Sequence, residues 1–205
     1  MDQPRLYLIT PALKDGASFA PVLEAALAAA PVACLRLRFA ADDEAAIRAV
    51  ADPLREVCHR HDVAVVLTDH FRLARPLGLD GVHLADPRLS ARDARKLLGL
   101  DAIVGAFAGN SRHQGMTVAE AGVDYVAFGP VADGGLGDGR VADEDLFRWW
   151  SEFITTPVVA EGEVDMESAR ALAPFADFIA VDAAVWDHSE GPAAAMRAFS
   201  ELLRD

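Results

Sequence analysis

Eight short apolar runs alternate with amphipathic stretches along the whole chain, and this alternation constrains the fold more than any other feature. Most of the runs are rich in Val, Ile, Leu or aromatic residues, as strands covered on both faces are. The pattern predicts strands at Leu6–Thr10, Cys34–Phe39, Ala64–Asp69, Gly81–Ala85, Ile103–Phe107, Tyr125–Gly129, Val158–Glu161 and Phe178–Asp182.

The stretches between these runs predict helices, because their apolar residues recur at helical spacing. Ser90, Ser111 and Asp165 stand where helices begin and have the side chains that cap them. Gly99 is placed to end a helix, and Pro192 fits the first turn of the last one. Two helices are predicted to bury one face each: Phe19, Val22, Leu23, Ala26 and Leu27 in the first, and Ile47, Val50, Leu54 and Val57 in the second.

Eight strand–helix units in 205 residues predict one (β/α)8 barrel domain covering residues 1–205, at the lower end of the size range of that fold. A doubly wound open sheet is the alternative that fits the same rhythm. No Pro-, Gly- or Ser-rich linker divides the chain. The segment Ala132–Val141 holds four glycines in ten residues and follows the sixth strand, so in a barrel it is predicted to be mobile on the catalytic face, either as a lid or as a loop freed from constraint.

Charge limits the classes of partner. The formal net charge of -13 and the sequence pI near 4.8 argue against nucleic acid and against anionic membranes. Two cysteines, Cys34 and Cys58, are typical of a reducing compartment. The sequence has neither a secretory signal nor an apolar run of the ~18 residues that a membrane span needs. We expect a cytoplasmic protein that binds a small heterocycle or phosphate ligand, and we leave open whether it forms a homo-oligomer.

Several motifs resemble one family in their order and spacing. They are "LYLIT" at the start, "LRLR", "TDHFRLA", "GLDGVHLAD", "AGVDYVAFGP" and, near the end, "ADFIAVDAAVW". The chain resembles thiamine phosphate synthases and their thiazole tautomerase relatives, which implies a (β/α)8 barrel. The synthase joins a pyrimidine diphosphate to a thiazole phosphate and releases pyrophosphate, so the resemblance also implies Mg²⁺.

The resemblance places Arg36 and Arg38 at positions that contact the diphosphate. Alternation along a strand puts Cys34, Arg36 and Arg38 on one side. Two arginines inside a barrel need partners, because an unpaired buried charge costs several kcal/mol. The alternative is therefore that these arginines form structural ion pairs with carboxylates of the barrel.

The metal positions implied by the resemblance are only partly kept. Asp69 matches a metal-binding aspartate, but Thr68 replaces the asparagine before it. Arg88 stands where the family has its second metal-binding acid, and Asp86, two residues earlier, is the candidate substitute. His83 could join Asp69 and Asp86 around a metal, although a hydrogen-bonded structural role is the alternative that we favour for it.

Other family positions also differ. Phe107 replaces a serine near the substrate, where its ring would fill space. Gly129 is kept, but the Thr-x-Thr/Ser-Lys motif that follows it in the family is missing from the glycine-rich loop. Pro130 stands where the tautomerases have a histidine. The tautomerase base is therefore absent as well.

The phosphate cup of the family, built from paired glycines after the seventh strand, is changed to "AEGEV". Gly162 is kept, Glu161 replaces an apolar residue and Glu163 replaces the second glycine, while Asp182 replaces a small or hydroxyl residue after the eighth strand. A carboxylate within ~4 Å of a phosphate repels it by several kcal/mol in a half-shielded site. We predict a cup that no longer favours an anion, with Asp182 paired to Arg36 or Arg38. The orientations of Glu161 and Glu163 stay open.

Three functions remain, and no catalytic residue is assigned. The first is the synthase reaction, with a metal on Asp69 and Asp86. The second is an enzyme acting on a neutral or cationic heterocycle, with Asp69, Glu163 or Asp182 as general base. That hypothesis predicts an open, acid-lined pocket, and a lumen filled by Phe107 and arginine pairs would speak against it. The third is a noncatalytic ligand-binding or interaction protein.

Overall fold

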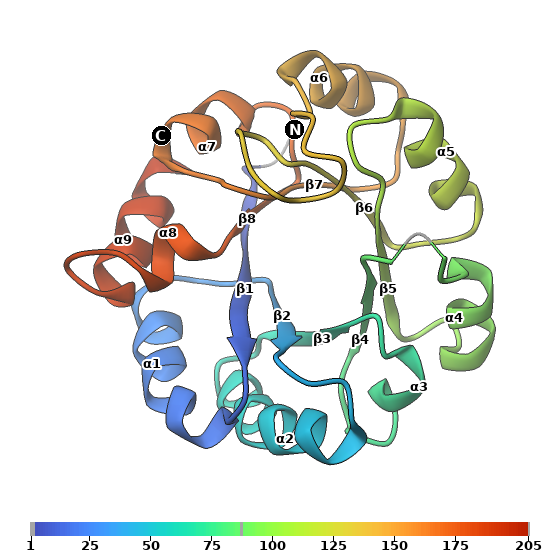
Figure 1. Cartoon of the computed structure of the whole chain (residues 1–205). Coiled ribbons are helices and arrows are strands. Elements are labelled where there is room, and N and C mark those ends of the chain that lie inside the picture. Colours follow the sequence, from blue (N-terminus) through green and yellow to red (C-terminus); the bar gives the residue numbers. More distant parts are fainter. Residues whose placement is uncertain (1–2, 87, 205) are drawn as a thin grey trace.

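All eight predicted strands form, and they pair in chain order as parallel neighbours until the last meets the first (Figure 1). The computed structural model describes residues 3–86 and 88–204. The closed barrel confirms the predicted (β/α)8 fold and excludes the open sheet. Its strands are β1 (Arg5–Leu13), β2 (Cys34–Phe39), β3 (Ala64–Thr68), β4 (Gly81–Leu84), β5 (Ile103–Phe107), β6 (Tyr125–Phe128), β7 (Val158–Ala160) and β8 (Phe178–Val181).

The helices surround the strands (Figure 1), and the predicted caps are confirmed. Ser90, Ser111 and Asp165 each accept hydrogen bonds from backbone amides of the helices that they precede, and Gly99 ends a helix with a φ of 84°. The helices are α1 (Gly16–Ala29), α2 (Glu44–Arg60), α3 (Phe71–Ala74), α4 (Ala91–Leu98), α5 (Arg112–Glu120), α6 (Glu144–Phe153), α7 (Met166–Leu172), α8 (Ala183–Trp186) and α9 (Pro192–Leu202).

The bounds of several elements differ from the prediction. Strand β1 is longer than expected, whereas β3, β4, β6, β7 and β8 each stop one residue early. Asp69, Glu161 and Asp182 therefore lie just after their strands, where the chain turns. In α1 the prediction for Val22 is wrong: it is 38% exposed, because it lies at the edge of a buried stripe formed by Leu23 and its helical neighbours.

Alternate residues of each strand pack in two separate shells. In β1, Leu6 and Leu8 face the helices, while Tyr7 and Ile9 belong to the small cluster inside the barrel. Gly105 makes room in this inner shell, because a Cβ there would lie 2.0 Å from Cζ of Tyr125. The hydroxyl groups of Tyr7 and Tyr125 make the inner shell partly polar, and this shell leads toward the carboxyl ends of the strands.

The glycine-rich segment lies at this end of the barrel, as predicted. After β6 the chain runs across the mouth between β6 and β7 before it enters α6 (Figure 1). The amide of Ala142 donates to the carbonyl of Pro130 at 2.8 Å, so the two ends of the segment are joined. Within the described chain, none of the helices combines the length and the apolar character needed to span a bilayer.

Candidate functional site

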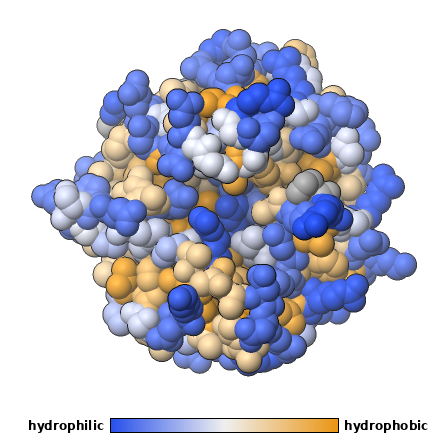
Figure 2. Space-filling view, in the orientation of Figure 1, coloured by the Kyte–Doolittle hydropathy of each residue, from blue (hydrophilic) through white to orange (hydrophobic). Residues whose placement is uncertain are grey.

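The residues singled out from the sequence gather at the mouth of the barrel, as the carboxyl ends of parallel strands require. Figure 2 shows hydrophilic residues in the middle of this face. The candidates come from β2 through β8 or from the turns that follow these strands: Arg36, Arg38, Thr68, Asp69, His83, Asp86, Phe107, Gly129, Gly162, Glu163 and Asp182.

An ion pair inside the barrel dominates the electrostatics of the site. Nη1 of Arg36 lies 2.7 Å from Oε2 of Glu161, and the two side chains are 7% and 1% exposed. Val159 belongs to the inner shell, so Glu161, two residues later, continues on the same side. The predicted pairing of Arg36 with Asp182 is wrong, because Glu161 reaches the guanidinium from the end of β7.

Burial and pairing act against each other in this ion pair. Burial raises the pKa of Glu161, and the nearby charge of Arg36 offsets only part of that effect. Burial lowers the pKa of Arg36, but the Glu161 carboxylate together with Tyr7 and Tyr125 outweighs this effect, so this pKa is raised. The raised pKa of Glu161 favours its neutral form, whereas the raised pKa of Arg36 favours its charged form. The 2.7 Å contact between the two side chains supports a charged pair at neutral pH. Arg36 is therefore engaged inside the protein.

His83 lies beside this pair and has the hydrogen-bonded structural role that the sequence favours. Its Nδ1 lies 3.0 Å from the hydroxyl of Tyr125, which lies 2.8 Å from the hydroxyl of Tyr7. Nε2 lies 3.7 Å from Oε1 of Glu161 and has no hydrogen-bond partner among the described residues. A proton on Nε2 would face the carboxylate favourably, so the geometry favours the tautomer in which Nδ1 accepts from Tyr125.

Acid should destabilise the fold through His83. Burial, and then the charge of Arg36, lower the pKa of His83 well below 6.5. As the pH falls below 6.5 the unfolded chain binds a proton that the folded chain does not, so stability falls by up to ~1.4 kcal/mol per pH unit. We expect His83→Gln to reduce the dependence of the unfolding free energy on pH by about one proton between pH 6.5 and 5, measured by urea titration.

His113 provides the matched control for this prediction, because it is exposed on α5 and His113→Gln should leave the slope unchanged. Comparison with the wild type also isolates His83 from Glu161. The raised pKa of Glu161 acts in the opposite direction, since its contribution is present below its ordinary value and is lost as the pH rises through the folded value. An unchanged slope in His83→Gln would contradict the prediction.

The remaining polar candidates around β2, β3 and β8 make fewer contacts. Arg38 is exposed, and its backbone amide donates to Oγ1 of Thr10 at 2.9 Å. Oγ1 of Thr68 donates to the carbonyl of Leu37 at 2.9 Å, so it supports the strand ladder. Asp182 is half-buried, and within the described chain it forms no ion pair. Its charge nevertheless raises the pKa of Glu161 slightly further.

The arrangement around Asp69 does not favour a metal. Oδ1 of Asp69 accepts from the amides of Ala85 and Asp86, at 2.6 and 3.0 Å, so the carboxylate fixes the turn after β4. Both oxygens of Asp86 accept from the guanidinium of Arg88, which lowers the pKa of Asp86 to about 2. Among the described residues no three His, Cys, Asp or Glu side chains form a group that could hold an ion. The residues present do not fit the Mg²⁺ that the resemblance implies.

The turn after β7 is covered by the loop that follows β6. A Cβ at Gly162 would lie 2.7 Å from Cδ2 of Leu136, so this leucine occupies the space above the glycine. A Cβ at Gly134 would lie 2.4 Å from Cγ of Glu163. Gly137 lies in the same way over the ring of Phe107. These contacts cover the mouth on the side of β5 to β7, which agrees with the lid that the sequence offered as one of two alternatives for this segment.

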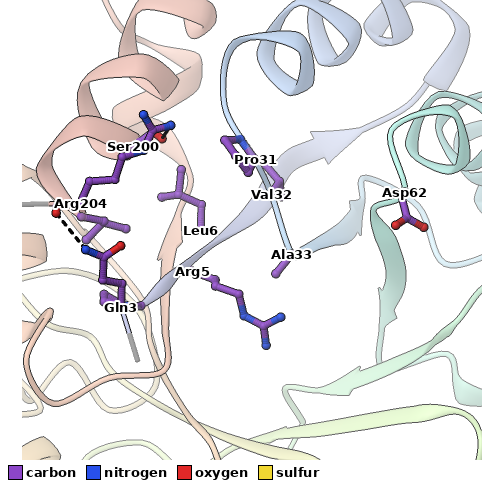
Figure 3. Close-up of a pocket in the computed structure, with 11 residues that line it drawn as sticks. Gln3, Arg5, Leu6, Pro31, Val32, Ala33, Asp62, Ser200 and Arg204 are labelled. Atoms are coloured by element: carbon purple, nitrogen blue, oxygen red, sulfur yellow. Dashed lines mark hydrogen bonds between the residues drawn. The ribbon is translucent and has the colours of Figure 1, made fainter. Parts of the chain in front are cut away.

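Two further glycine and cavity observations complete the geometry. Gly129 is buried where β6 approaches β7, and a Cβ there would lie 2.1 Å from the carbonyl oxygen of Glu161. A cavity of about 360 Å³ lies at the opposite end of the barrel (Figure 3). Arg5, Ser200 and Arg204 are among its lining residues, and Gln3 bridges to the carbonyl of Arg204. This cavity is remote from the mouth, so we do not assign the candidate chemistry to it.

Comparison with known proteins decides the family. The family model described as thiamine monophosphate synthase matches residues 6–185. The chain belongs to this family. A thiamine-phosphate synthase of Rhodospirillum centenum is 45% identical over 100% of both chains, and one of Hyphomonas neptunium is 41% identical over 97% of this chain and 93% of its own. The structure of a thiamine phosphate pyrophosphorylase from Pyrococcus furiosus superposes with a TM-score of 0.85 at 22% identity, covering 99% of this chain and 96% of its own.

In this barrel of the thiamine monophosphate synthase family, the sequence alone did not predict the role of four residues at the site. Tyr7, Tyr125 and Leu136 were not singled out, and Glu161 was left without an orientation. The signal for the tyrosines is their parity: each stands in a strand at a position that alternates with residues facing the helices. No local pattern indicates that Leu136 returns to Gly162, because that contact depends on the path of the loop.

Proposed function

We propose that this member of the thiamine monophosphate synthase family catalyses thiamine phosphate formation weakly or not at all. The observation that carries the proposal is the buried pair between Arg36 and Glu161. By resemblance, Arg36 is a diphosphate contact, and here its charge is already compensated at 2.7 Å inside the barrel. A cation neutralised in the ground state offers little to the charge that develops on a pyrophosphate leaving group.

The surroundings of the pair support the same proposal. Glu163 adds a negative charge at the turn where the family has a glycine, and Leu136 lies over Gly162. Asp86 is engaged by Arg88, so among the described residues no further acid joins Asp69 in a group that could hold a metal. An enzyme acting on a neutral or cationic heterocycle is less favoured, because the lumen holds the pair of Arg36 with Glu161 and Leu136 covers the turn after β7. We therefore favour a protein that binds a ligand and catalyses the synthase reaction weakly or not at all.

Synthase activity itself is the second candidate. It is favoured by full-length relatives named thiamine-phosphate synthase at 45% and 41% identity. Asp69, Arg36 and Arg38 also remain at the positions that the resemblance implies. In this case the loop and the ion pair would rearrange when substrate binds, and Glu161 would release the guanidinium.

An assay of the purified protein separates the two candidates. The protein is incubated with the thiazole phosphate, the pyrimidine diphosphate and Mg²⁺, and thiamine phosphate is quantified; the Rhodospirillum centenum relative is the matched control. We expect kcat/KM at least about tenfold below that of the relative, since a loss of ~1.4 kcal/mol in binding already costs a factor of ten. Equal rates would refute the proposal and establish the second candidate.

A further inference from the structure

The side chain of Leu136 lies over Gly162, at the turn after β7. Cδ2 of Leu136 lies 2.7 Å from the place of a Gly162 Cβ, and that Cβ would also lie 3.0 Å from Cα of Pro130. A phosphate that accepts from the amides of this turn needs the space over the turn, and the Leu136 side chain lies over the same turn.

The amides beneath this leucine are available to a ligand. Within the part of the chain that the structure describes, the backbone N–H groups of Gly162 and Glu163 have no hydrogen-bond acceptor. The carbonyl of Gly162, in contrast, accepts from the amide of Val131 at 2.9 Å. Donors are thus kept at the turn, although an apolar side chain covers it.

Besides its contacts with Phe107, Gly162 and Glu163, the loop is held by hydrogen bonds at its two ends, and none of residues 132–141 is fully buried. Nδ2 of Asn110, which precedes α5, donates to the carbonyl of Arg140 at 3.0 Å. Arg140 pairs with Asp138 inside the loop, and Gly137 and Gly139 have φ values of 62° and 77°. Few buried contacts and two glycines with left-handed backbone are features of a segment that opens at low cost in free energy.

We propose that Leu136 is a gate residue that excludes phosphoryl groups from the turn after β7 until the segment 131–142 lifts. The inference rests on the proposed function, in which the mouth disfavours anions, and it assigns part of that exclusion to a side chain rather than to charge. A ligand that needs the amides of Gly162 and Glu163 binds only the open form. Its apparent affinity is reduced by the fraction of molecules that are open.

Binding of inorganic phosphate tests the gate. It is measured by calorimetry in Glu163→Gly, where the charge is gone, and in the double variant that adds Leu136→Gly. The matched control adds Val141→Gly instead, because Val141 is in the same segment and is 40% exposed. We expect the double variant with Leu136→Gly to bind phosphate about tenfold more tightly than Glu163→Gly, and the control to bind as Glu163→Gly does. Equal affinities with and without Leu136 would overturn the gate.

Amide hydrogen exchange provides a second readout that needs no ligand. Leu136→Gly in the otherwise wild-type chain should accelerate exchange of the Val131 amide about tenfold, while Val141→Gly should not. Unchanged exchange would overturn the gate as well. The proposed function fails by a different result, namely rapid thiamine phosphate formation by the wild-type protein in the synthase assay. The failure of the gate and the failure of the proposed function are therefore distinguishable.

Discussion

Glu161→Leu should destabilise the protein by about 3–5 kcal/mol, because it leaves the Arg36 guanidinium buried without its counter-charge. Only 7% of the Arg36 side chain is exposed, so water can replace the lost carboxylate only in part. The change also removes the negative neighbour of His83 Nε2. Urea unfolding followed by circular dichroism measures the effect as a lower midpoint at a similar slope.

The double variant Arg36→Leu, Glu161→Leu separates charge from packing. Replacing both members of a buried ion pair with apolar residues is often neutral or stabilising, so most of the loss in Glu161→Leu should be recovered. The exposed pair between Arg48 and Glu44 is the control, and removing Glu44 should cost less than ~1 kcal/mol. A cost for Glu161→Leu as small as that of the surface control would mean that Arg36 reaches solvent.

Glu163→Gly should produce the largest functional change, a gain of about 100-fold in affinity for inorganic phosphate. The carboxylate repels an anion at the turn, and the family has a glycine at this position. Glu163 also has a φ of 57°, which a glycine adopts without strain. The change therefore removes a negative charge and fits the local backbone.

Glu163→Gln is the matched control for this second prediction, because it removes the charge and keeps the side chain. If repulsion dominates, Glu163→Gln should recover most of the gain; if the size of the side chain dominates, only Glu163→Gly should. Phosphate binding is measured by calorimetry at constant ionic strength, since salt screens the effect. Affinity that stays unchanged in both variants would show that Glu163 points away from the anion.

The fold was predictable because each level of the sequence indicates the same answer. Eight apolar runs of strand length alternate with helical patterns, and Ser90, Ser111 and Asp165 mark helix starts that the structure confirms. The last residue of several strands was not predictable. The backbone amides of Asp69 and Glu161 still donate to the carbonyls of His83 and Phe128, at 2.9 and 3.0 Å, but regular pairing stops one residue earlier, and only the neighbouring strands fix that point.

The sequence was sufficient to predict which residues lie at the mouth of the barrel, but not which of them contact one another. Inward parity within β2 places Arg36 in the barrel, and position after a strand places Asp69 and Glu163 at the mouth, since the fold brings such positions together. Which acid reaches Arg36 depends on the register between strands: Glu161 and Asp182 both follow inward positions, and the backbone of Asp182 turns away at φ -136° and ψ -101°. Short sequence windows hold no information on such long-range choices.

The hydrogen bond between Ala142 and Pro130 has a practical consequence for engineering. Since this bond fastens the base of the loop independently of what the tip contains, the eleven residues between its two ends, 131–141, form an exchangeable cassette. A segment bearing the Thr-x-Thr/Ser-Lys motif that the family resemblance implies could be grafted between these two anchors while the barrel wall stays intact. Such chimeras would ask whether transferase chemistry can be rebuilt from one contiguous piece of chain.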